Sequence, residues 1–257
     1  MNVLTVDIGN SRVKIDIWNE SGHLYHEVAE KLNPSFISRI INLYDIEGAS
    51  FCAVGKESDE TYRSAYEMLK GNVSYFTTEN SFCKEIFETY NGRLGADRAA
   101  ACLGAVSLFP STPIMIVDAG TAMTIDVVNA DGIFCGGNIS LGVKSRLRAL
   151  HDFTKLLPEV EADRHINHFG NNTISAMKSG ALTGCVAEIL YDLGNAKKEY
   201  NVNTLILTGG DANLLLPFIE KSATDIVHDP YLVSRGLNVD FRNQHSITNQ
   251  TLCYETT

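Results

Sequence analysis

The chain has 257 residues, of which 44% are hydrophobic, so it can build a sizeable folded core and is not a disordered partner segment. Its formal net charge is −10, because 31 acidic residues outnumber 21 lysines and arginines, and no basic run occurs. We expect no nucleic-acid partner, since phosphate backbones need a basic face, and no membrane partner, since no run of about 18 apolar residues occurs.

The chain begins with MNVLTVDIGN, which lacks the charged leader and the apolar segment of a secretory signal. Its six cysteines lie far apart and form no CxxC pair. A chain of this length also does not need disulfide bonds to stabilise its core. We therefore expect a cytoplasmic protein whose cysteines are reduced thiols.

Two apolar strands joined by a tight turn are predicted by the stretch VLTVDIGNSRVKIDIWNESG, which begins at residue 3. Because Gly9 has no Cβ, an anion can approach the backbone N–H groups of this turn closely. Asp7 is placed to hold a hydrated Mg²⁺ beside a phosphate, and Lys14 adds positive charge. Asn10 and Ser11 would donate from the side. The alternative is an ordinary hairpin in which these residues only form the turn.

The rest of the first half alternates between helices and strands. Apolar periodicity predicts helices over 37–44 and 61–70, and strands over 49–54 and 73–76. A longer helix is predicted over 96–108, and prolines follow it closely.

The segment GADRAAACLGAV places an acid and a guanidinium in the first turn of this longer helix. In one interpretation, Asp97 accepts the proton of an alcohol that attacks a γ-phosphate, and Arg98 holds an acidic substrate or the transferring group. In the other, Asp97 only complements the helix dipole and the two side chains form a surface ion pair. The residues themselves leave both interpretations open.

An internal repeat connects the two halves of the chain. The segment VDIGNSRVKIDIWNESGHL, from residue 6, matches VDAGTAMTIDVVNADGIF, from residue 117, after one residue is dropped in the turn. Both copies have an apolar strand, a DxG turn with a hydroxyl close behind, and a second strand with an acid at an equivalent position, Asp16 or Asp126. The repeat favours a duplicated domain, and it makes Asp118 the counterpart of Asp7.

The second half continues the alternation. Helices are predicted over 142–150 and 173–200, and a strand over 204–207 runs into the turn Thr208-Gly209-Gly210-Asp211. The bare backbone of this turn could let an adenosine lie against it, or the two glycines are ordinary loop punctuation.

Strands and helices in this order predict an α/β protein with two lobes in series and a cleft between them. The expected lobes are residues 1–110 and 111–257, the second ending in a polar, weakly ordered tail from Asn243. Two DxG hairpins facing each other across a cleft are suited to holding the phosphate chain of a nucleotide. No GxxxxGK[ST] or GxGxxG motif occurs.

The motifs DIGNSRVK, GADR, VDAGTAMTID, CGGNISLGV, GNNTISAMKSG and LTGGDA occur in this order along the chain. Together they resemble the successive signatures of type III pantothenate kinases, which belong to the actin, sugar-kinase and heat-shock-chaperone ATPase superfamily. The resemblance implies two tandem ribonuclease H-like lobes, a duplicated actin-like ATPase fold with a nucleotide cleft between the lobes. It also implies a homodimeric enzyme that phosphorylates pantothenate to 4′-phosphopantothenate with ATP, the first step of coenzyme A biosynthesis.

The resemblance also implies roles for individual residues. Asp97 would be the general base, and Asp118 would ligate a monovalent cation, K⁺ or NH₄⁺, while Mg²⁺ would accompany ATP. Thr173 would contact pantothenate from the dimer-related region. The implied ATP-binding residues are Asp7, Ile8, Gly9, Asn10, Ser11, Arg12, Val13, Lys14 and Thr121, and the implied pantothenate-binding residues are Tyr90, Gly95, Ala96, Asp97, Arg98 and Thr173.

Two other functions stay open at this point. A relative on the same scaffold could phosphorylate another small alcohol or a sugar, although the GADR segment and Thr173 favour pantothenate. A non-catalytic regulatory relative is the other alternative. Asp97 and Asp118 argue against that role, because a regulator needs neither acid, and the acidic balance of the chain argues against direct contact with DNA.

Overall fold

The computed structural model describes residues 1–9, 11–53, 59–81, 84–88, 90–91, 94–220 and 225–254. The chain forms two compact units. Unit 1 contains Met1–Leu108 together with Tyr231–Thr257, and unit 2 contains Phe109–Pro230. Each unit is built around one mixed β-sheet.

The sheet of unit 1 has β1 at its centre. All six residues of β1 are buried, because β2 pairs with it in antiparallel orientation, β4 pairs with it in parallel orientation, and helices cover both faces. The outer strand β3 instead alternates between half-buried and exposed residues. The strand order is β3-β2-β1-β4-β5, with bounds β1 (Val3–Ile8), β2 (Val13–Asn19), β3 (Gly22–Ala29), β4 (Gly48–Ala53) and β5 (Val73–Tyr75).

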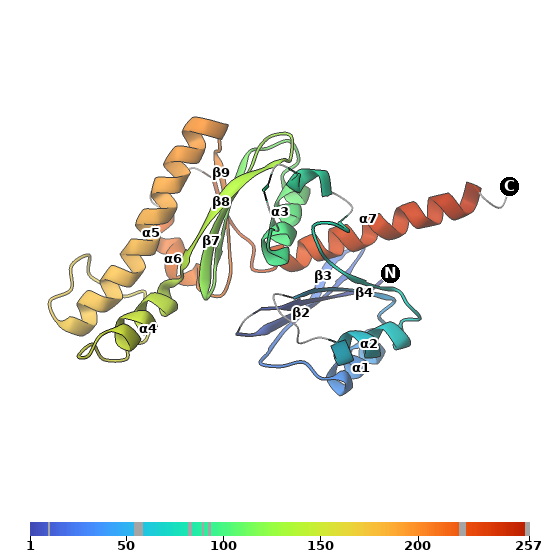
Figure 1. Cartoon of the computed structure of the whole chain (residues 1–257), viewed down its shortest axis with the longest axis horizontal. Helices are drawn as coiled ribbons and strands as arrows, with labels where there is room; N and C mark the ends of the chain where they lie inside the picture. Colours follow the sequence, from blue (N-terminus) through green and yellow to red (C-terminus); the bar gives the residue numbers. More distant parts are fainter. Residues whose placement is uncertain are drawn as a thin grey trace. The chain divides into compact units, whose positions relative to one another are not determined.

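Alternate residues of β1 contact helices on opposite faces of this sheet (Figure 1). Leu4 and Val6 pack with Ile37 of α1 in the core. Between them, the hydroxyl of Thr5 lies 2.7 Å from that of Ser234 on α7. The helical elements of unit 1 are α1 (Pro34–Leu43), α2 (Asp59–Met68), the short 3-10 helix η1 (Lys84–Phe87), α3 (Ala96–Leu108) and α7 (Leu232–Tyr254).

Two glycines let α3 and α7 cross at very close range. A Cβ added to Gly104 would lie 2.3 Å from the carbonyl oxygen of Leu232, and one added to Gly236 would lie 1.8 Å from that of Ala100. Hydrogen atoms in place of side chains therefore bring the two backbones together. The expected second lobe, residues 111–257 with a weakly ordered tail, differs from this arrangement, because α7 packs with unit 1 and continues the chain as helix to Tyr254.

Unit 2 repeats the sheet topology of unit 1, with β6 in the place of β1. Its antiparallel neighbours β7 and β8 lie on one side, and its parallel neighbours β9 and β10 lie on the other. The strand order is β10-β9-β6-β7-β8, with bounds β6 (Ile114–Ala119), β7 (Ala122–Val128), β8 (Phe134–Leu141), β9 (Thr204–Thr208) and β10 (Asp225–His228).

The irregularities of the two sheets repeat as well. The pairing of β2 with β3 shifts between Ile17 and Trp18, and that of β7 with β8 shifts at the equivalent place, between Val127 and Val128. In the first hairpin the N–H of Gly9 donates to the carbonyl of Arg12, whereas in the second the N–H of Gly120 donates to that of Ala122. The second turn is one residue shorter, as the sequence repeat predicts, so the duplication and the two-lobed α/β fold are confirmed.

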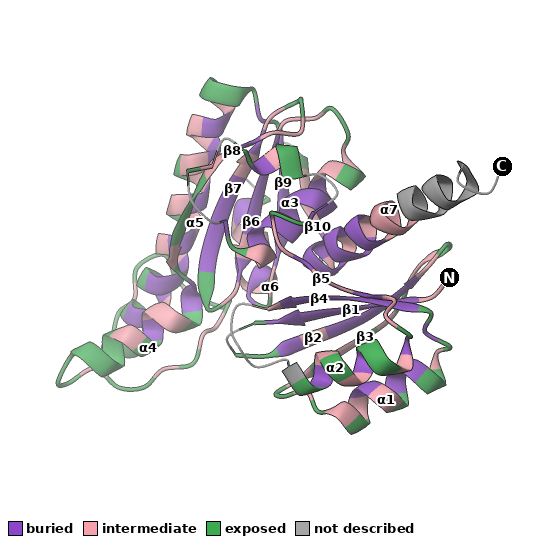
Figure 2. Ribbon diagram, turned by 45° about the vertical axis from the view of Figure 1, so that its right-hand side comes forward, coloured by how far each residue is buried: buried purple, intermediate pink, exposed green. Residues whose placement is uncertain are grey.

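The 28-residue helix α5 packs against the sheet of unit 2. Helix α5 begins at the side-chain cap of Asn172 and ends at Asn201, whose φ of 58° is left-handed, so its observed bounds match the predicted 173–200. Buried residues of α5 such as Leu182 and Ile189 pack against Val117 of β6. Figure 2 shows this buried core and the exposed surface at α4. The helices are α4 (Val143–Phe153), α5 (Thr173–Tyr200) and α6 (Ala212–Ile219).

None of the helices in the described part of the chain is long and apolar enough to cross a membrane. Among the cysteines whose side chains are described, all are free thiols: Cys52, Cys102, Cys135 and Cys185.

Candidate active site

The turn between β1 and β2 carries most of the residues predicted to bind ATP. The N–H of Gly9 donates to the carbonyl of Arg12 at 3.1 Å and closes the turn. Asp7, at the end of β1, is 7% exposed, and its Oδ2 lies 3.7 Å from Nζ of Lys14, which pairs with it on β2. The turn thus combines a buried carboxylate, an ammonium group and a glycine. Asn10 lies outside the described residues.

The other predicted ATP-binding residues of this hairpin divide by exposure. The side chains of Ile8 and Val13 are 7% and 5% exposed and belong to the core of unit 1, so only their backbone is suited to contact a ligand. Ser11 and Arg12 are exposed on the turn. A ligand at this turn would therefore meet the side chains of Ser11 and Arg12 first.

The start of α3 holds the predicted general base. The Oδ1 atom of Asp97 accepts a hydrogen bond from the N–H of Arg98 at 2.9 Å, and the side chain is half-buried. A Cβ added to Gly95 would lie 2.7 Å from that same oxygen, so a larger residue there would displace the Asp97 carboxylate. Arg98 is 7% exposed, so its guanidinium does not lie open on the surface as an ion pair would. Half-buried Tyr90 follows η1, and its N–H donates to the carbonyl of Phe87.

The buried thiol of Cys52 lies near both Asp97 and Asp7. Cys52 on β4 pairs with Asp7 of β1 and has no exposed surface. Burial raises the pKa of the Cys52 thiol well above its usual value, and the negative charges of Asp7 and Asp97 raise this pKa further. Both carboxylates therefore lie within electrostatic range of one sulfur atom. This places the first hairpin and the start of α3 at the same end of the unit 1 sheet.

The second hairpin, between β6 and β7, is held close to the end of β9. Asp118 pairs with Thr208 across these two strands, and Gly209 follows with a φ of 92°, which favours glycine. A Cβ added to Gly209 would lie 2.4 Å from Oδ1 of Asp118 and 2.5 Å from the carbonyl oxygen of Ala119. The predicted Thr208-Gly209-Gly210 turn and the second DxG hairpin therefore lie directly against each other in unit 2.

Helix α4 begins against the same hairpin. Its N-cap is Gly142, whose N–H donates to the carbonyl of Thr121 at 3.1 Å, and Ser145 Oγ donates to that carbonyl at 2.7 Å. A Cβ added to Gly142 would lie only 1.9 Å from the carbonyl oxygen of Gly120. The positive end of the α4 dipole thus lies beside the exposed turn residue Thr121, a favourable position for an anion.

An ion pair that the sequence does not suggest completes the surroundings of this hairpin. Lys144, in the first turn of α4, places Nζ 2.5 Å from Oδ1 of Asp211, whose side chain is 5% exposed. The N–H of Asp211 also donates to the carbonyl of Ala119 at 2.8 Å. Sequence patterns missed Lys144 and Gly142, because their partners are distant in the chain. One feature of the sequence could have indicated Gly142: a glycine, and not a residue with a capping side chain, precedes the predicted helix.

Thr173 is the one predicted substrate residue in unit 2. It is the exposed first residue of α5, directly after the cap in which the Asn172 side chain accepts from the N–H of Ser175. It lies on neither hairpin turn. A substrate contact made by Thr173 stays a prediction.

The donor atoms of the two hairpins are compatible with hard cations. Asp7 offers carboxylate oxygens beside the turn of the first hairpin, and such oxygens are ligands that Mg²⁺ prefers. Asp118 offers a carboxylate oxygen near the carbonyl oxygen of Ala119, since both lie about 2.4–2.5 Å from a Cβ added to Gly209, and oxygen ligands suit hard cations.

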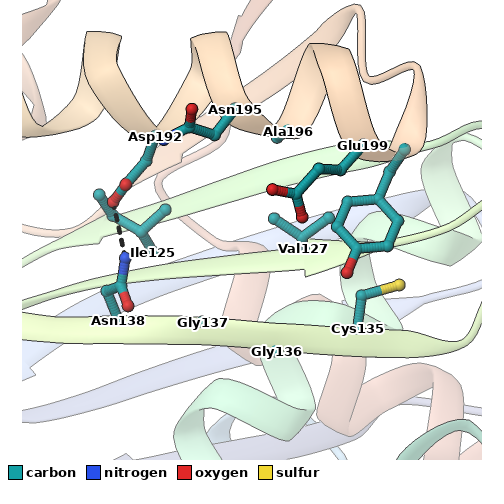
Figure 3. Close-up of a pocket in the computed structure, with 11 residues that line it drawn as sticks. Ile125, Val127, Cys135, Gly136, Gly137, Asn138, Asp192, Asn195, Ala196 and Glu199 are labelled. Atoms are coloured by element: carbon teal, nitrogen blue, oxygen red, sulfur yellow. Dashed lines mark hydrogen bonds between the residues drawn. The ribbon is translucent and has the colours of Figure 1, made fainter.

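A cavity of unit 2 near β8 is a separate feature (Figure 3). This cavity of ≈ 200 Å³ lies between β8 and α5, and Gly136 and Gly137 form part of its floor. Across it, Asn138 donates to Asp192 at 2.9 Å. Burial raises the pKa of the Cys135 thiol on its wall, so this cysteine is not an activated nucleophile. No residue predicted to bind ATP or pantothenate lines this cavity.

Comparison with known proteins identifies the relatives of this chain. The family model described as type III pantothenate kinase matches residues 3–191. A type III pantothenate kinase of Porphyromonas gingivalis strain W83 is 42% identical over 244 residues, covering 91% of this chain and 96% of the relative.

Solved structures extend the comparison to the fold. A conserved protein of Campylobacter jejuni, assigned to the Baf family of transcriptional activators, has a TM-score of 0.60 and 22% identity, covering 95% of this chain and 99% of its own. The activator of 2-hydroxyisocaproyl-CoA dehydratase from Clostridium difficile, solved with bound ADPNP, has a TM-score of 0.53 and 12% identity, covering 97% and 98%. At these identities the structures show a common fold alone.

Proposed function

The chain belongs to the type III pantothenate kinase family, and on this premise we propose how it acts as a pantothenate kinase. It transfers the γ-phosphoryl group of ATP to the primary hydroxyl of pantothenate, the first step of coenzyme A biosynthesis. The observation that carries the proposal is the pair of equivalent DxG hairpins, one in each unit, together with Asp97 and Asp7 at one end of the unit 1 sheet. The expected cytoplasmic location stays a prediction.

The hairpin turns bind the phosphate groups of ATP. The turn closed by Gly9 and Arg12 presents backbone N–H groups with the hydroxyl of Ser11, and Lys14 neutralises part of the negative charge. In unit 2, Thr121 and the first turn of α4 offer a second place for an anion. Phosphoryl transfer mainly requires positioning and charge neutralisation, which these groups supply without a P-loop.

Asp97 acts as the general base. Its carboxylate takes the proton of the primary hydroxyl as the hydroxyl oxygen bonds to the γ-phosphorus and the bond to the leaving ADP breaks. One carboxylate oxygen is held by the N–H of Arg98, which leaves the other to receive the proton. We propose that the residues flanking Asp97 in the chain form the pantothenate pocket: Tyr90, Gly95, Ala96 and Arg98.

Two cations are proposed to accompany the reaction. Asp7 would hold Mg²⁺ with ATP, and this ion would supply positive charge against the phosphate oxygens. Asp118 would hold a monovalent cation, K⁺ or NH₄⁺, whose charge would offset the repulsion between the acids of an acidic protein and a polyphosphate.

A coupled assay of pantothenate-dependent ADP formation tests this function. We expect turnover in K⁺ or NH₄⁺ and a large decrease when Na⁺ is the only monovalent cation. In the Asp118→Asn variant, turnover should be low in all three salts. Absence of pantothenate-dependent turnover in any salt would overturn the proposed function, and turnover with another alcohol or a sugar in its place would identify a kinase of different specificity. Equal turnover in K⁺ and Na⁺ would remove only the cation from the proposal.

We also propose a homodimer that buries exposed apolar side chains of unit 2. Phe153, Leu156 and Phe169 are 88%, 92% and 82% exposed, and Ile174 beside Thr173 is 50% exposed. The loop that carries Leu156 and Phe169 is held to α5, since Ser179 Oγ donates to carbonyl oxygens of residues 167 and 168. Such large, fixed apolar groups are typical of a surface that another protein covers. Because Thr173 is next to Ile174, it would lie beside the second copy in such a dimer.

Phe169→Asp is expected to convert the dimer to a monomer, because a carboxylate buried in an apolar interface is strongly unfavourable. Light scattering after gel filtration measures the mass, which should fall from twice 28.2 kDa to 28.2 kDa. Leu43→Asp is the matched control, since Leu43 is a 63% exposed apolar residue of α1 in unit 1, and it should leave the dimer intact. A wild-type protein that is monomeric at enzyme concentrations, or an unchanged mass for Phe169→Asp, would contradict this surface.

A further inference from the structure

A cluster of two imidazoles and one carboxylate lies on β2 and β3 of unit 1, outside the residues assigned to either substrate. Oδ1 of Asp16 lies 2.8 Å from Nε2 of His23 and 2.7 Å from Nδ1 of His26. The three donor atoms all lie within 4.8 Å of one another. The Asp16 side chain is 2% exposed, whereas those of His23 and His26 are 19% and 30% exposed. The cluster is therefore anchored in the protein and reachable from solvent on its histidine side.

A β-bulge causes the two histidines to converge. Residues three apart in a regular strand point to opposite faces of the sheet. Here the pairing shifts, so that Ile17 pairs with Tyr25 but Trp18 pairs with His23, and Leu24 is the extra residue. The bulge brings the His23 side chain to the face that carries His26 and Asp16. This local irregularity, and not the sequence spacing alone, makes the cluster.

The second copy of the fold shows that the sheet does not require these imidazoles. Asp126, the equivalent of Asp16, is likewise buried, with 1% of its surface exposed. Across from it on β8 stands Gly137 in place of His26, and Phe134 pairs with Val128 in place of His23 with Trp18. Both copies keep the buried acid and the bulge, but only unit 1 adds two metal-ligating side chains. The histidines therefore serve something other than the shared architecture.

We propose that Asp16, His23 and His26 bind a divalent transition-metal ion such as Zn²⁺. Imidazole nitrogen and carboxylate oxygen are ligands that Zn²⁺ takes at about 2.0–2.2 Å, and in tetrahedral coordination such ligands are about 3.3 Å apart. The two nitrogens, now 2.7 and 2.8 Å from the carboxylate oxygen, need to move away from this oxygen by about half an ångström. Solvent supplies the remaining position on the histidine side. Mg²⁺ and K⁺ prefer all-oxygen sites and are not expected here.

Aromatic rings hold one of the ligands in place and connect the site to α7. Tyr231 stacks on His23 with ring centroids 3.8 Å apart, and Trp18 packs edge-on against the same ring at 4.9 Å. Nε1 of Trp18 donates to Ser234 of α7 at 2.7 Å. Since packed neighbours orient metal ligands, these rings prearrange His23. The ion would join β2 and β3 and support the point at which the chain returns to unit 1 at Tyr231.

Titration of the untagged, chelator-treated protein with Zn²⁺ tests the site, with a chromophoric zinc indicator as competitor and calorimetry for stoichiometry. We expect one ion per chain, with zinc affinity lowered at least about 10-fold in His26→Ala and in His23→Phe. The second substitution introduces the residue that the second copy has at this position. His165→Ala is the matched control. His165 is an exposed histidine whose Nδ1 lies 3.2 Å from Oδ1 of Asp163. This pair has one imidazole and not two, so the loss of His165 should leave zinc affinity unchanged.

Zinc should also raise the unfolding temperature of the wild-type protein and of His165→Ala, but not that of the two cluster variants. Circular dichroism checks that both cluster variants are folded, and the exposed position of His26 makes its variant the safer of the two. Wild-type protein that binds no zinc, or that binds it equally well after His26→Ala and His23→Phe, would show that the cluster is only a hydrogen-bonded triad. Neither outcome depends on pantothenate turnover.

Discussion

Asp97→Asn is expected to lower kcat for pantothenate phosphorylation by about 10²–10⁴-fold, the usual contribution of a positioned general base. Asparagine has nearly the same shape as aspartate and can still accept the hydrogen bond from the N–H of Arg98, now 2.9 Å from Oδ1. It cannot take up a proton at neutral pH. The substitution therefore removes the proposed chemistry and leaves the local geometry in place.

The same variant should remain folded and bind ATP nearly as well as the wild type. Loss of one negative charge in the first turn of α3 costs about 0.3–1 kcal/mol of stability, which thermal unfolding can measure. Nucleotide affinity is measured by calorimetry in the absence of pantothenate. Glu85→Gln is the control for charge alone, since Glu85 is an exposed acid in the first turn of η1 in the same unit.

The comparison separates a catalytic from a structural role for Asp97. Turnover within a few-fold of the wild type would remove Asp97 from the mechanism. A decrease shared by Glu85→Gln would indicate a general effect of charge on this unit. A decrease accompanied by weaker ATP binding or a large loss of stability would assign Asp97 to the architecture of the α3 start.

Gly142→Ala is expected to destabilise unit 2 by about 3 kcal/mol and to weaken ATP binding at the same time. The new Cβ would lie 1.9 Å from the carbonyl oxygen of Gly120, a backbone atom that has no side-chain freedom to move away. Either α4 or the hairpin turn must shift. Because the turn holds Thr121, proposed to contact ATP, a structural change here also displaces that contact.

Thermal unfolding and nucleotide titration measure the two effects. For a chain of this length, about 3 kcal/mol corresponds to a decrease in Tm of about 6–12 °C. Gly194→Ala is the matched control, because Gly194 lies inside α5 and an added Cβ meets nothing within 4 Å. It should stabilise the helix by about 0.5–1 kcal/mol and leave nucleotide affinity unchanged. Wild-type stability and affinity for Gly142→Ala would show that the turn yields readily and that its position is unimportant.

The hairpins and helix bounds of this protein can be predicted from its sequence. Apolar alternation around the DxG turns predicts both hairpins, and the residue missing from the second turn corresponds to the bond from Gly120 to Ala122 in place of that from Gly9 to Arg12. The bounds of helix α5 can be predicted because a cap precedes the helix and a left-handed residue ends it. These features depend on interactions between residues close together in the chain.

Features that depend on distant contacts were not predictable in the same way. The ion pair of Lys144 with Asp211 and the approach of Gly142 to Gly120 join segments whose proximity only the folded sheet creates. The placement of α7 in unit 1 depends on Gly104 and Gly236, which look like ordinary helix glycines in sequence. Sequence-based assignment of the last residues to the second lobe failed for this reason.

The return of α7 to unit 1 has a consequence for synthesis on the ribosome. Chains emerge from the N-terminus and their domains generally fold as units. Phe109–Pro230 is continuous, so unit 2 can complete its sheet as soon as that segment is free. In unit 1, Thr5 and Trp18 lie on the face of the sheet that α7 covers through Ser234. This face stays exposed until the segment that forms α7 has left the ribosome. The half of the protein made first is therefore the half that finishes last.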